Sequence, residues 1–145
     1  MAISRNKVIH YNMNNENTNA EAFKRFMSEL LYKMTKEQIN NSIFILDNLI
    51  CHKTLELYQF YNENKLKILF NAPYISEFNM IEYLFRYLKN ITYKKLYCSV
   101  KELKSDVISL INNAENIDIL EKIYKETLRK YISFYNENKL LNLNS

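Results

Sequence analysis

The hydrophobic positions of this chain follow two spacings, one typical of helices and one typical of short buried strands. Apolar residues that recur every three to four positions predict helices, and short runs of β-branched and aromatic residues predict strands. The predicted strands lie within residues 2–13, 41–47 and 65–70, and the predicted helices open near residues 18, 52, 79, 99 and 117. The pattern therefore favours the α/β class, with the last two helices forming a helical tail.

One face of each predicted helix is expected to pack into a core. The inward residues are Phe23, Phe26, Met27, Leu30, Leu31 and Met34; Ile81, Leu84, Phe85 and Leu88; Leu103, Val107, Leu110 and Ile111; and Leu120, Ile123, Leu128 and Tyr131. Thr18-x-x-Glu21 and Ser99-x-x-Glu102 have the spacing of a capping box, so each is expected to start a helix. Within 2–13, Val8 and His10 should lie on one face of a strand.

The middle of the chain predicts a unit of two parallel strands joined by a helix. The run "NSIFILD" at 41–47 resembles a strand buried on both faces, a helix covers 52–64, and "KLKILF" at 65–70 is a second buried strand. This order places Asp47 at the carboxyl end of its strand. Open α/β sheets hold their functional sites at that edge.

Composition narrows the class of protein. Of 145 residues, 48% are hydrophobic and 25% are charged, which suits one ordered domain spanning 1–145. No apolar run approaches the roughly 20 residues of a membrane span, and the start "MAISRNKV" lacks a signal peptide's apolar core, so we expect an intracellular location and no membrane partner. The net charge of +4 permits nucleic-acid binding without requiring it. Two cysteines and two histidines fit reduced thiols better than a zinc site. The heptapeptide "FYNENKL" occurs twice, at 60–66 and 134–140, and we interpret it as compositional bias or a local copy.

Asp47 and Glu82 are the candidate pair for chemistry. Between them lie 82 − 47 − 1 = 34 residues, which carry one predicted helix and one predicted strand. The chain should therefore return to the same edge of the sheet at Glu82. Two carboxylates converging there suit a hard divalent ion such as Mg²⁺, which prefers carboxylate oxygen and bridges to phosphates.

Both acids lie in motifs that resemble a known family. "FILDNLICHK" looks like the second-aspartate motif of mariner-like DDE transposases and their bacterial insertion-sequence relatives, Leu-Asp-Asn-x-x-x-His-Lys. "APYISEFNMIEYLFRYLK" is similar to the motif that carries the family's glutamate, and it shares Pro73, Tyr74, Asn79 and Glu82 with that motif. The spacing of 34 residues is also the family's own. The resemblance covers residues 2 to 95 and, more loosely, the tail.

The resemblance implies a ribonuclease-H-like fold with a mixed sheet, and metal-dependent cleavage and strand transfer of DNA at transposon ends. Asp47 would match the second acid of the catalytic triad and Glu82 the third, both as ligands of Mg²⁺ or Mn²⁺. Asn48, His52 and Asn79 match motif positions near the site. The location would be the nucleus if the source is eukaryotic.

The same resemblance leads us to expect an incomplete fold. The family's first catalytic aspartate belongs on a strand upstream of the segment corresponding to "AISRNKVIHY", and no aspartate precedes Asp47. We therefore expect an amino-terminally truncated catalytic domain, with a sheet core and the Glu82 helix in 1–98 and the helical tail in 99–145. By itself, this domain should have impaired catalytic activity. The missing part would come from an upstream-encoded segment or from a partner chain, which includes a second copy in a homodimer.

Each residue also has a simpler interpretation. Asp47-Asn48 is a common turn pair, Asn79-x-x-Glu82 has capping-box spacing, and His52 fits a hydrogen-bonded structural role. A basic stretch interleaved with tyrosines suits either DNA contact or a solvated helix face. Its candidate DNA-binding residues are Arg86, Lys89, Lys94 and Lys95. The alternative function is therefore a non-catalytic DNA-binding or assembly module derived from a transposase.

Overall fold

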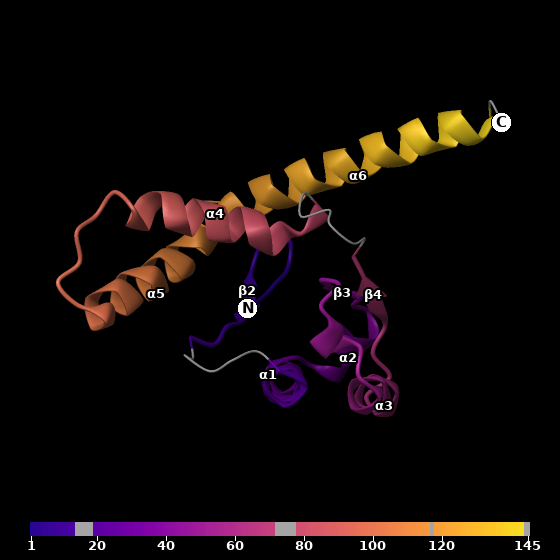
Figure 1. The fold of residues 1–145 in the computed structure, drawn as a ribbon, viewed down its shortest axis with the longest axis horizontal. Coiled ribbons are helices and arrows are strands. Elements are labelled where there is room, and N and C mark those ends of the chain that lie inside the picture. The colour runs from indigo at the N-terminus through magenta and orange to yellow at the C-terminus, as the bar shows by residue number, and fades with distance from the viewer. Residues whose placement is uncertain (14–18, 72–77, 117, 144–145) are drawn as a thin grey trace. The chain divides into compact units, whose positions relative to one another are not determined.

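The computed structural model describes residues 1–13, 19–71, 78–116 and 118–143 (Figure 1). Its elements alternate between strands and helices in the first half of the chain and are helical in the second half. In chain order they are β1 (Ala2–Ile3), β2 (Val8–His10), α1 (Ala20–Tyr32), α2 (Lys36–Asn40), β3 (Phe44–Leu46), the 3-10 helix η1 (Ile50–His52), α3 (Leu55–Glu63), β4 (Ile68–Phe70), α4 (Met80–Thr92), α5 (Val100–Asn116) and α6 (Ile119–Leu143).

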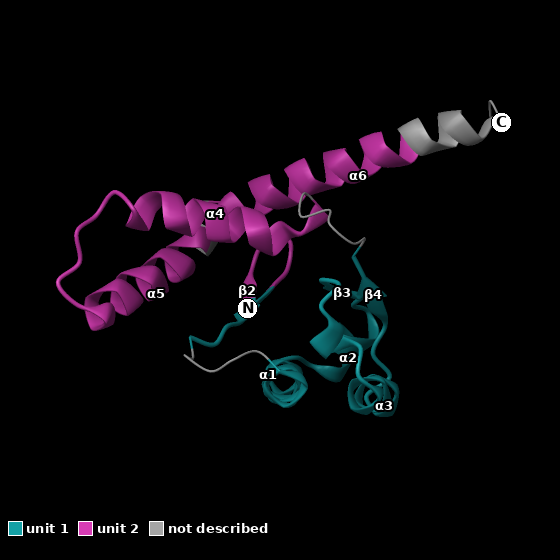
Figure 2. Cartoon of the chain, viewed as in Figure 1, with its two compact units in different colours: residues 1–2, 9–75 teal, residues 3–8, 76–145 magenta. Residues whose placement is uncertain are grey.

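The chain divides into two compact units (Figure 2). The first comprises residues 1–2 and 9–75, and the second comprises residues 3–8 and 76–145. Each unit is described by itself below. That residues 1–145 form a single domain stays a prediction.

The first unit contains the predicted parallel pair of strands. β3 pairs with β4 in parallel register, with Phe44 opposite Ile68 and Leu46 opposite Phe70. Helix α3 makes the crossover, because parallel neighbours cannot be joined by a tight turn. The side chain of Thr54 starts α3 by accepting a hydrogen bond from the backbone N–H of Leu57. The prediction of a strand–helix–strand unit is confirmed.

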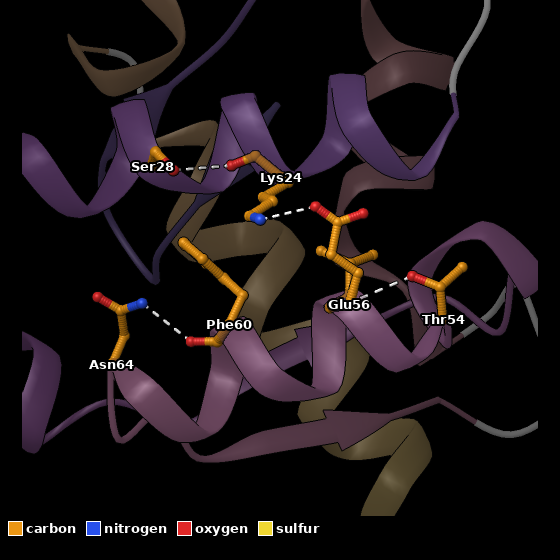
Figure 3. A network of polar contacts seen from close by, with 7 residues as sticks. Lys24, Ser28, Thr54, Glu56, Phe60 and Asn64 are labelled. Carbon is orange, nitrogen blue, oxygen red and sulfur yellow. Dashed lines mark hydrogen bonds and ion pairs between the residues drawn. The ribbon is translucent and has the colours of Figure 1, made fainter.

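Helices α1 and α3 build the core of this unit. Met27 and Leu30 of α1 are buried with Leu57, Phe60 and Tyr61 of α3. The remaining apolar residues predicted to face inward from α1 are partly buried against this cluster. An ion pair also joins the two helices, with Lys24 Nζ 2.7 Å from Glu56 Oε1 (Figure 3).

The prediction that β3 is buried on both faces was wrong. Ile45 and Leu69, which are register partners in β3 and β4, are each 53% exposed. Phe44, Leu46, Ile68 and Phe70 pack on the helical core instead. Successive side chains of a strand point to opposite faces, so only one face of this pair is covered.

We expected one mixed sheet, but the strands of the described residues form two separate pairs. β1 pairs with β2, and β3 pairs with β4. The first pair is a hairpin closed by a hydrogen bond from Ser4 N to Lys7 O of 2.7 Å. His10 at the end of β2 is buried, with its Nε2 2.9 Å from Glu29 and its Nδ1 2.9 Å from Lys33.

Helix α1 begins one residue later than the capping-box pattern suggests. Asn19 is its N-cap, and the Asn19 side chain accepts a hydrogen bond from Ala22 N. Thr18, which we expected to open the helix, lies outside the described residues. The capping role falls to the neighbouring asparagine, which satisfies a free backbone N–H of the first turn equally well.

The second unit packs α4, α5 and α6 around a core of their inward stripes. Its buried apolar residues are Phe78, Leu84, Leu88, Ile111, Ala114, Leu120 and Ile123. Two predicted inward residues are exposed instead, Phe85 at 36% and Leu128 at 42%. Each lies one position after a better-placed neighbour, Leu84 in α4 and the buried Thr127 in α6. A step of one residue turns the helix by about 100°, which moves both side chains to the edge of the stripe.

The two copies of "FYNENKL" adopt different backbones. The first copy ends α3 at Glu63, and Lys65 then takes a positive φ of 54° before β4 begins. The second copy lies wholly within α6, which continues to Leu143. The same seven residues thus end one helix and continue another, because packing overrides a local preference.

A polar cluster holds the loop between α4 and α5. Asp106 Oδ2 accepts a hydrogen bond of 2.6 Å from the Tyr97 hydroxyl, and both carboxylate oxygens lie 2.9 Å from Lys95 Nζ. Helix α5 starts as predicted, since Ser99 Oγ accepts from Glu102 N and the Glu102 carboxylate accepts from Cys98 N. Cys98 itself is exposed and Cys51 is partly buried, both as free thiols.

This cluster predicts a stability that depends on pH. The hydrogen bond from Tyr97 and then the Lys95 ammonium lower the pKa of Asp106 below its usual 3.8. Loss of solvent contact, and then the bond to Asp106, raise the pKa of Tyr97 to about 12. The contribution of Asp106 is therefore complete above its ordinary pKa and is lost as the pH falls through the lowered one. The contribution of Tyr97 is complete below about pH 10 and is lost towards pH 12.

We expect the melting temperature of Asp106→Asn to lie below that of the wild type at neutral pH, and the difference to shrink below pH 4. Tyr97→Phe should remove the alkaline change and also the larger part of the acid one, because the Tyr97 hydroxyl is the main cause of the lowered pKa of Asp106; Lys95, which still contacts Asp106, should keep the rest. Thermal melts followed by circular dichroism across this pH range measure both effects. A difference between wild type and Asp106→Asn that stays constant from pH 2 to pH 7 would contradict the role of this carboxylate.

Candidate functional site

The end of β3 positions the first candidate acid. The ladder continues past β4 through a hydrogen bond from Asn71 N to Leu46 O of 2.7 Å, and Asp47 follows directly. Asp47 therefore lies at the carboxyl end of a parallel pair of strands, as predicted. Its side chain is 44% exposed, so the carboxylate is partly accessible while one of its oxygens is shielded.

His52 is the partner of that shielded oxygen. It ends the short helix η1, and its ring is buried at a centroid distance of 3.9 Å from Phe23 of α1. The backbone carbonyl of His52 accepts a hydrogen bond of 3.0 Å from the Tyr61 hydroxyl. Burial raises the pKa of Tyr61 to about 12, so this hydroxyl remains a donor through the physiological range. Packing from α1 and α3 thus fixes the histidine ring.

The contact between Asp47 and His52 is close but is not an aligned hydrogen bond. His52 Nδ1 lies 2.7 Å from Asp47 Oδ1, both atoms are buried, and neither makes an aligned hydrogen bond to any described residue. His52 therefore shields Oδ1 from solvent, and Oδ2 is the carboxylate oxygen left for a ligand.

Asn48 belongs to the same edge through a residue that the sequence analysis did not select. Asn48 Oδ1 accepts a hydrogen bond from Lys53 Nζ, and this ammonium also lies 4.9 Å from the centre of the Phe70 ring. Lys53 brings a positive charge to the carboxyl end of β3 and β4. A signal for it was present, because Lys53 is the last residue of the Asp-Asn-x-x-x-His-Lys motif.

The second candidate acid starts helix α4 in the other unit. Asn79 is the N-cap, and its side chain accepts a hydrogen bond of 3.2 Å from Ile81 N. Glu82 lies in the first turn with an exposed side chain, where the helix dipole favours a carboxylate. The predicted convergence of Glu82 with Asp47 stays a prediction, since the two residues belong to separately described units. Pro73 and Tyr74 lie outside the described residues.

The predicted DNA-binding residues differ in their surroundings. Arg86 lies 5.4 Å from the centre of the Tyr83 ring, which Lys130 of α6 also approaches at 5.1 Å. Lys89 and Lys94 are exposed. Lys95 is paired with Asp106, so part of its charge is already compensated within the protein.

The described residues do not form a metal site by themselves. Across the described ranges, no three His, Cys, Asp or Glu side chains are grouped so as to hold an ion. At the end of β3, the Asp47 carboxylate has the His52 ring nitrogen 2.7 Å from one of its oxygens. Mg²⁺ is typically held by one or two carboxylates together with waters and substrate phosphates, so Asp47 would be one ligand among several.

Comparison with known proteins identifies the family. A family model described as DDE superfamily endonuclease matches residues 1–104, which include both motifs, Asp47 and Glu82. This chain therefore belongs to the DDE superfamily endonucleases. Searches of curated proteins and of solved structures return no match. In the described part of the chain, no helix has the length and apolarity needed to cross a membrane.

The Asp47–His52 contact predicts energetic coupling between the two residues. His52→Ala should lower the free energy of unfolding by about 2–4 kcal/mol, because it leaves a cavity beside Phe23 and a buried oxygen without a partner. Asp47→Ala should cost less in the His52→Ala background than in the wild type, with a coupling of about 1–2 kcal/mol. Urea denaturation of the four proteins measures this cycle.

The other histidine is the matched control. His10 is also buried but contacts Glu29 and Lys33 rather than Asp47. A cycle between Asp47→Ala and His10→Ala should therefore be additive within about 0.5 kcal/mol. Additivity in the Asp47–His52 cycle would show that the contact contributes nothing in solution.

Proposed function

We propose that this chain provides two of the three acids of a mariner-like DDE transposase, Asp47 as the second and Glu82 as the third. The reaction class is metal-dependent cleavage and joining of DNA at transposon ends, with Mg²⁺ or Mn²⁺ as the ion. The family match over residues 1–104 supports the DNA-processing class, and the two motifs support the mariner-like subgroup. Recognition of particular DNA ends is outside this proposal.

The proposal depends mainly on how neighbouring side chains hold the Asp47 carboxylate. A residue that only closed a turn would need no buried partner, yet His52, Phe23 and Tyr61 together fix one oxygen of this carboxylate. Side chains that bind metals are typically held in this way by neighbouring groups, which set the direction of the free lone pairs. Glu82 fits the same function, because the capped first turn of α4 presents it to solvent.

The proposal includes a requirement for a third carboxylate. Two-metal chemistry places two ions about 3.5–4 Å apart, and two acids are too few to hold both. No aspartate precedes Asp47 in the sequence; of the earlier acids, Glu21, Glu29 and Glu37 lie on α1 and α2, and Glu16 lies outside the described residues. We infer that the first acid of the triad comes from an added segment or a partner chain, and that residues 1–145 alone are nearly inactive.

A nicking and strand-joining assay tests this function. The substrate is DNA that carries the ends of the element encoding this chain, with Mg²⁺ or Mn²⁺ present. We expect background activity from residues 1–145 and recovered activity when the chain is extended by the coding sequence immediately upstream. In the extended chain, Asp47→Asn and Glu82→Gln should each reduce activity at least 100-fold, since each removes a metal ligand.

Asp118→Asn and Glu63→Gln are matched controls for the loss of one acid, and both should keep full activity. If Asp47→Asn and Glu82→Gln leave the activity of the extended chain unchanged, the assignment of these two acids is wrong. Strong activity from residues 1–145 that Asp47→Ala abolishes would instead overturn the inference that the first acid of the triad comes from outside these residues.

A second candidate function is DNA binding without catalysis. It is favoured by the arrangement around α4, where Arg86 and Lys130 flank Tyr83 and where Lys89 and Lys94 are exposed. Lysine and arginine bind phosphates by releasing counterions, and this binding does not require an intact acid pair. The two functions are compatible, because a transposase must also hold its DNA.

The binding function predicts salt-dependent affinity for duplex DNA that survives Asp47→Ala and Glu82→Ala. Lys94→Gln should weaken binding and reduce the slope of log K against log salt by about 1, and Lys95→Gln should have a smaller effect because Asp106 already pairs with it. Fluorescence anisotropy at several salt concentrations measures both. Lys36→Gln, which changes an exposed lysine of α2, is the control. No binding at low salt would rule out this function.

A further inference from the structure

The loop that joins α4 to α5 exposes apolar side chains to an unusual degree. Leu96 is 100% exposed, Tyr93 is 81% exposed, and Val100 at the start of α5 is 68% exposed. In Figure 1 the loop leaves the end of α4 as a wide arc before it enters α5. Isolated apolar residues are common on protein surfaces, but a wholly exposed leucine between two lysines and a tyrosine invites a functional explanation.

This loop is held in place rather than left free. The backbone amides of Lys94 and Lys95 donate to the carbonyls of Ile91 and Thr92, which extends the end of α4. Lys95 and Tyr97, on either side of Leu96, both bind Asp106 of α5. The Leu96 backbone is therefore tied at its two neighbours. The backbone that presents the exposed side chain therefore has less conformational entropy to lose on binding than a free loop would have.

The charges around Leu96 favour a polyanion. Lys94 and Lys101 are exposed, and Glu102 is the only acid between Arg86 and Lys104. The Glu102 carboxylate already accepts a hydrogen bond from Cys98 N at the start of α5. The loop thus combines exposed apolar groups with a positive rim.

We propose that residues 93–101 form a wedge for duplex DNA, in which Leu96 enters between base pairs while Lys94 and Lys101 contact the flanking phosphates. Apolar side chains such as leucine are used in this way by proteins that bend DNA through the minor groove. Tyr93 can stack on a base that the wedge exposes. The Asp106 cluster is the support that keeps the wedge rigid. This inference rests on the proposed function only in taking DNA as the partner.

A lipid surface fits these residues less well than DNA. Membrane binding grows with the apolar area inserted, and stable attachment needs more than one short anchor. Here one leucine, one tyrosine and one valine are spread over a loop rather than aligned on a helix face. A base step, by contrast, accommodates a single side chain.

The test uses duplex DNA with 2-aminopurine at one position, whose fluorescence rises when the base is unstacked. A second duplex carries a mismatch beside the probe, because a wedge binds most readily where stacking is already weak. We expect the protein to raise the fluorescence and to prefer the mismatched duplex. Leu96→Ala should abolish the fluorescence change and weaken binding to the mismatched duplex about tenfold, while Leu96→Met should keep both properties.

Leu55→Ala is the matched control, since Leu55 is 76% exposed and lies on α3 in the other unit. Because Leu96 is fully exposed, its substitution should leave the circular dichroism spectrum and the melting temperature unchanged. Asp106→Asn should reduce the fluorescence change without removing salt-dependent binding.

The outcomes separate this inference from the proposed function. If the protein binds DNA but 2-aminopurine fluorescence does not change, or changes equally with Leu96→Ala, the wedge is wrong and DNA binding stands. If no DNA binds at low salt, the DNA-binding function fails together with the wedge. Binding to vesicles of anionic lipid that depends on Leu96, without a Leu96-dependent effect on DNA, would overturn the wedge in favour of a membrane contact.

Discussion

The parallel pairing of β3 with β4 is the constraint on which the candidate site depends. A parallel pair requires a crossover, and α3 supplies it while it buries Leu57 and Phe60 against α1. The crossover brings the carboxyl ends of both strands to one edge. Asp47 and Asn48 directly follow β3 there, and Phe70 ends β4. If this pairing were lost, the site residues would have no common location.

The site is also an example of core packing used to orient a polar group. Phe23 belongs to the apolar stripe of α1, yet its ring lies against His52 and not only against aliphatic core residues. Tyr61 is buried in α3 and donates its hydroxyl to the His52 backbone. Asp47 Oδ1 and His52 Nδ1 are both shielded from water and lie 2.7 Å apart. A carboxylate fixed in this way is suited to a ligand that demands a defined geometry.

Family membership and the details of this chain answer different questions. The match to DDE superfamily endonucleases gives the class of chemistry and makes DNA the natural substrate. In the proposed wedge, the loop between α4 and α5 contacts that substrate. The side chains of Lys95 and Tyr97 are held by Asp106 and are less able to contact a partner. Leu96, which lies between them, is fully exposed. A leucine that the fold does not bury is free to serve a partner.

The sequence by itself determined helices α1, α3, α4, α5 and α6, the parallel strand–helix–strand unit and the location of Asp47, because these follow from local spacing and chain connectivity. It did not predict the short helices α2 and η1. It also singled out His52, but not its contact with Asp47, nor Lys53 at Asn48. Those contacts depend on where α1 and η1 pack, which no local pattern encodes. The tertiary structure alone decided that Ile45 is exposed, and that "FYNENKL" ends one helix and continues another. Burial and backbone conformation at such positions are fixed by neighbours distant in sequence, since packing energy exceeds local preference.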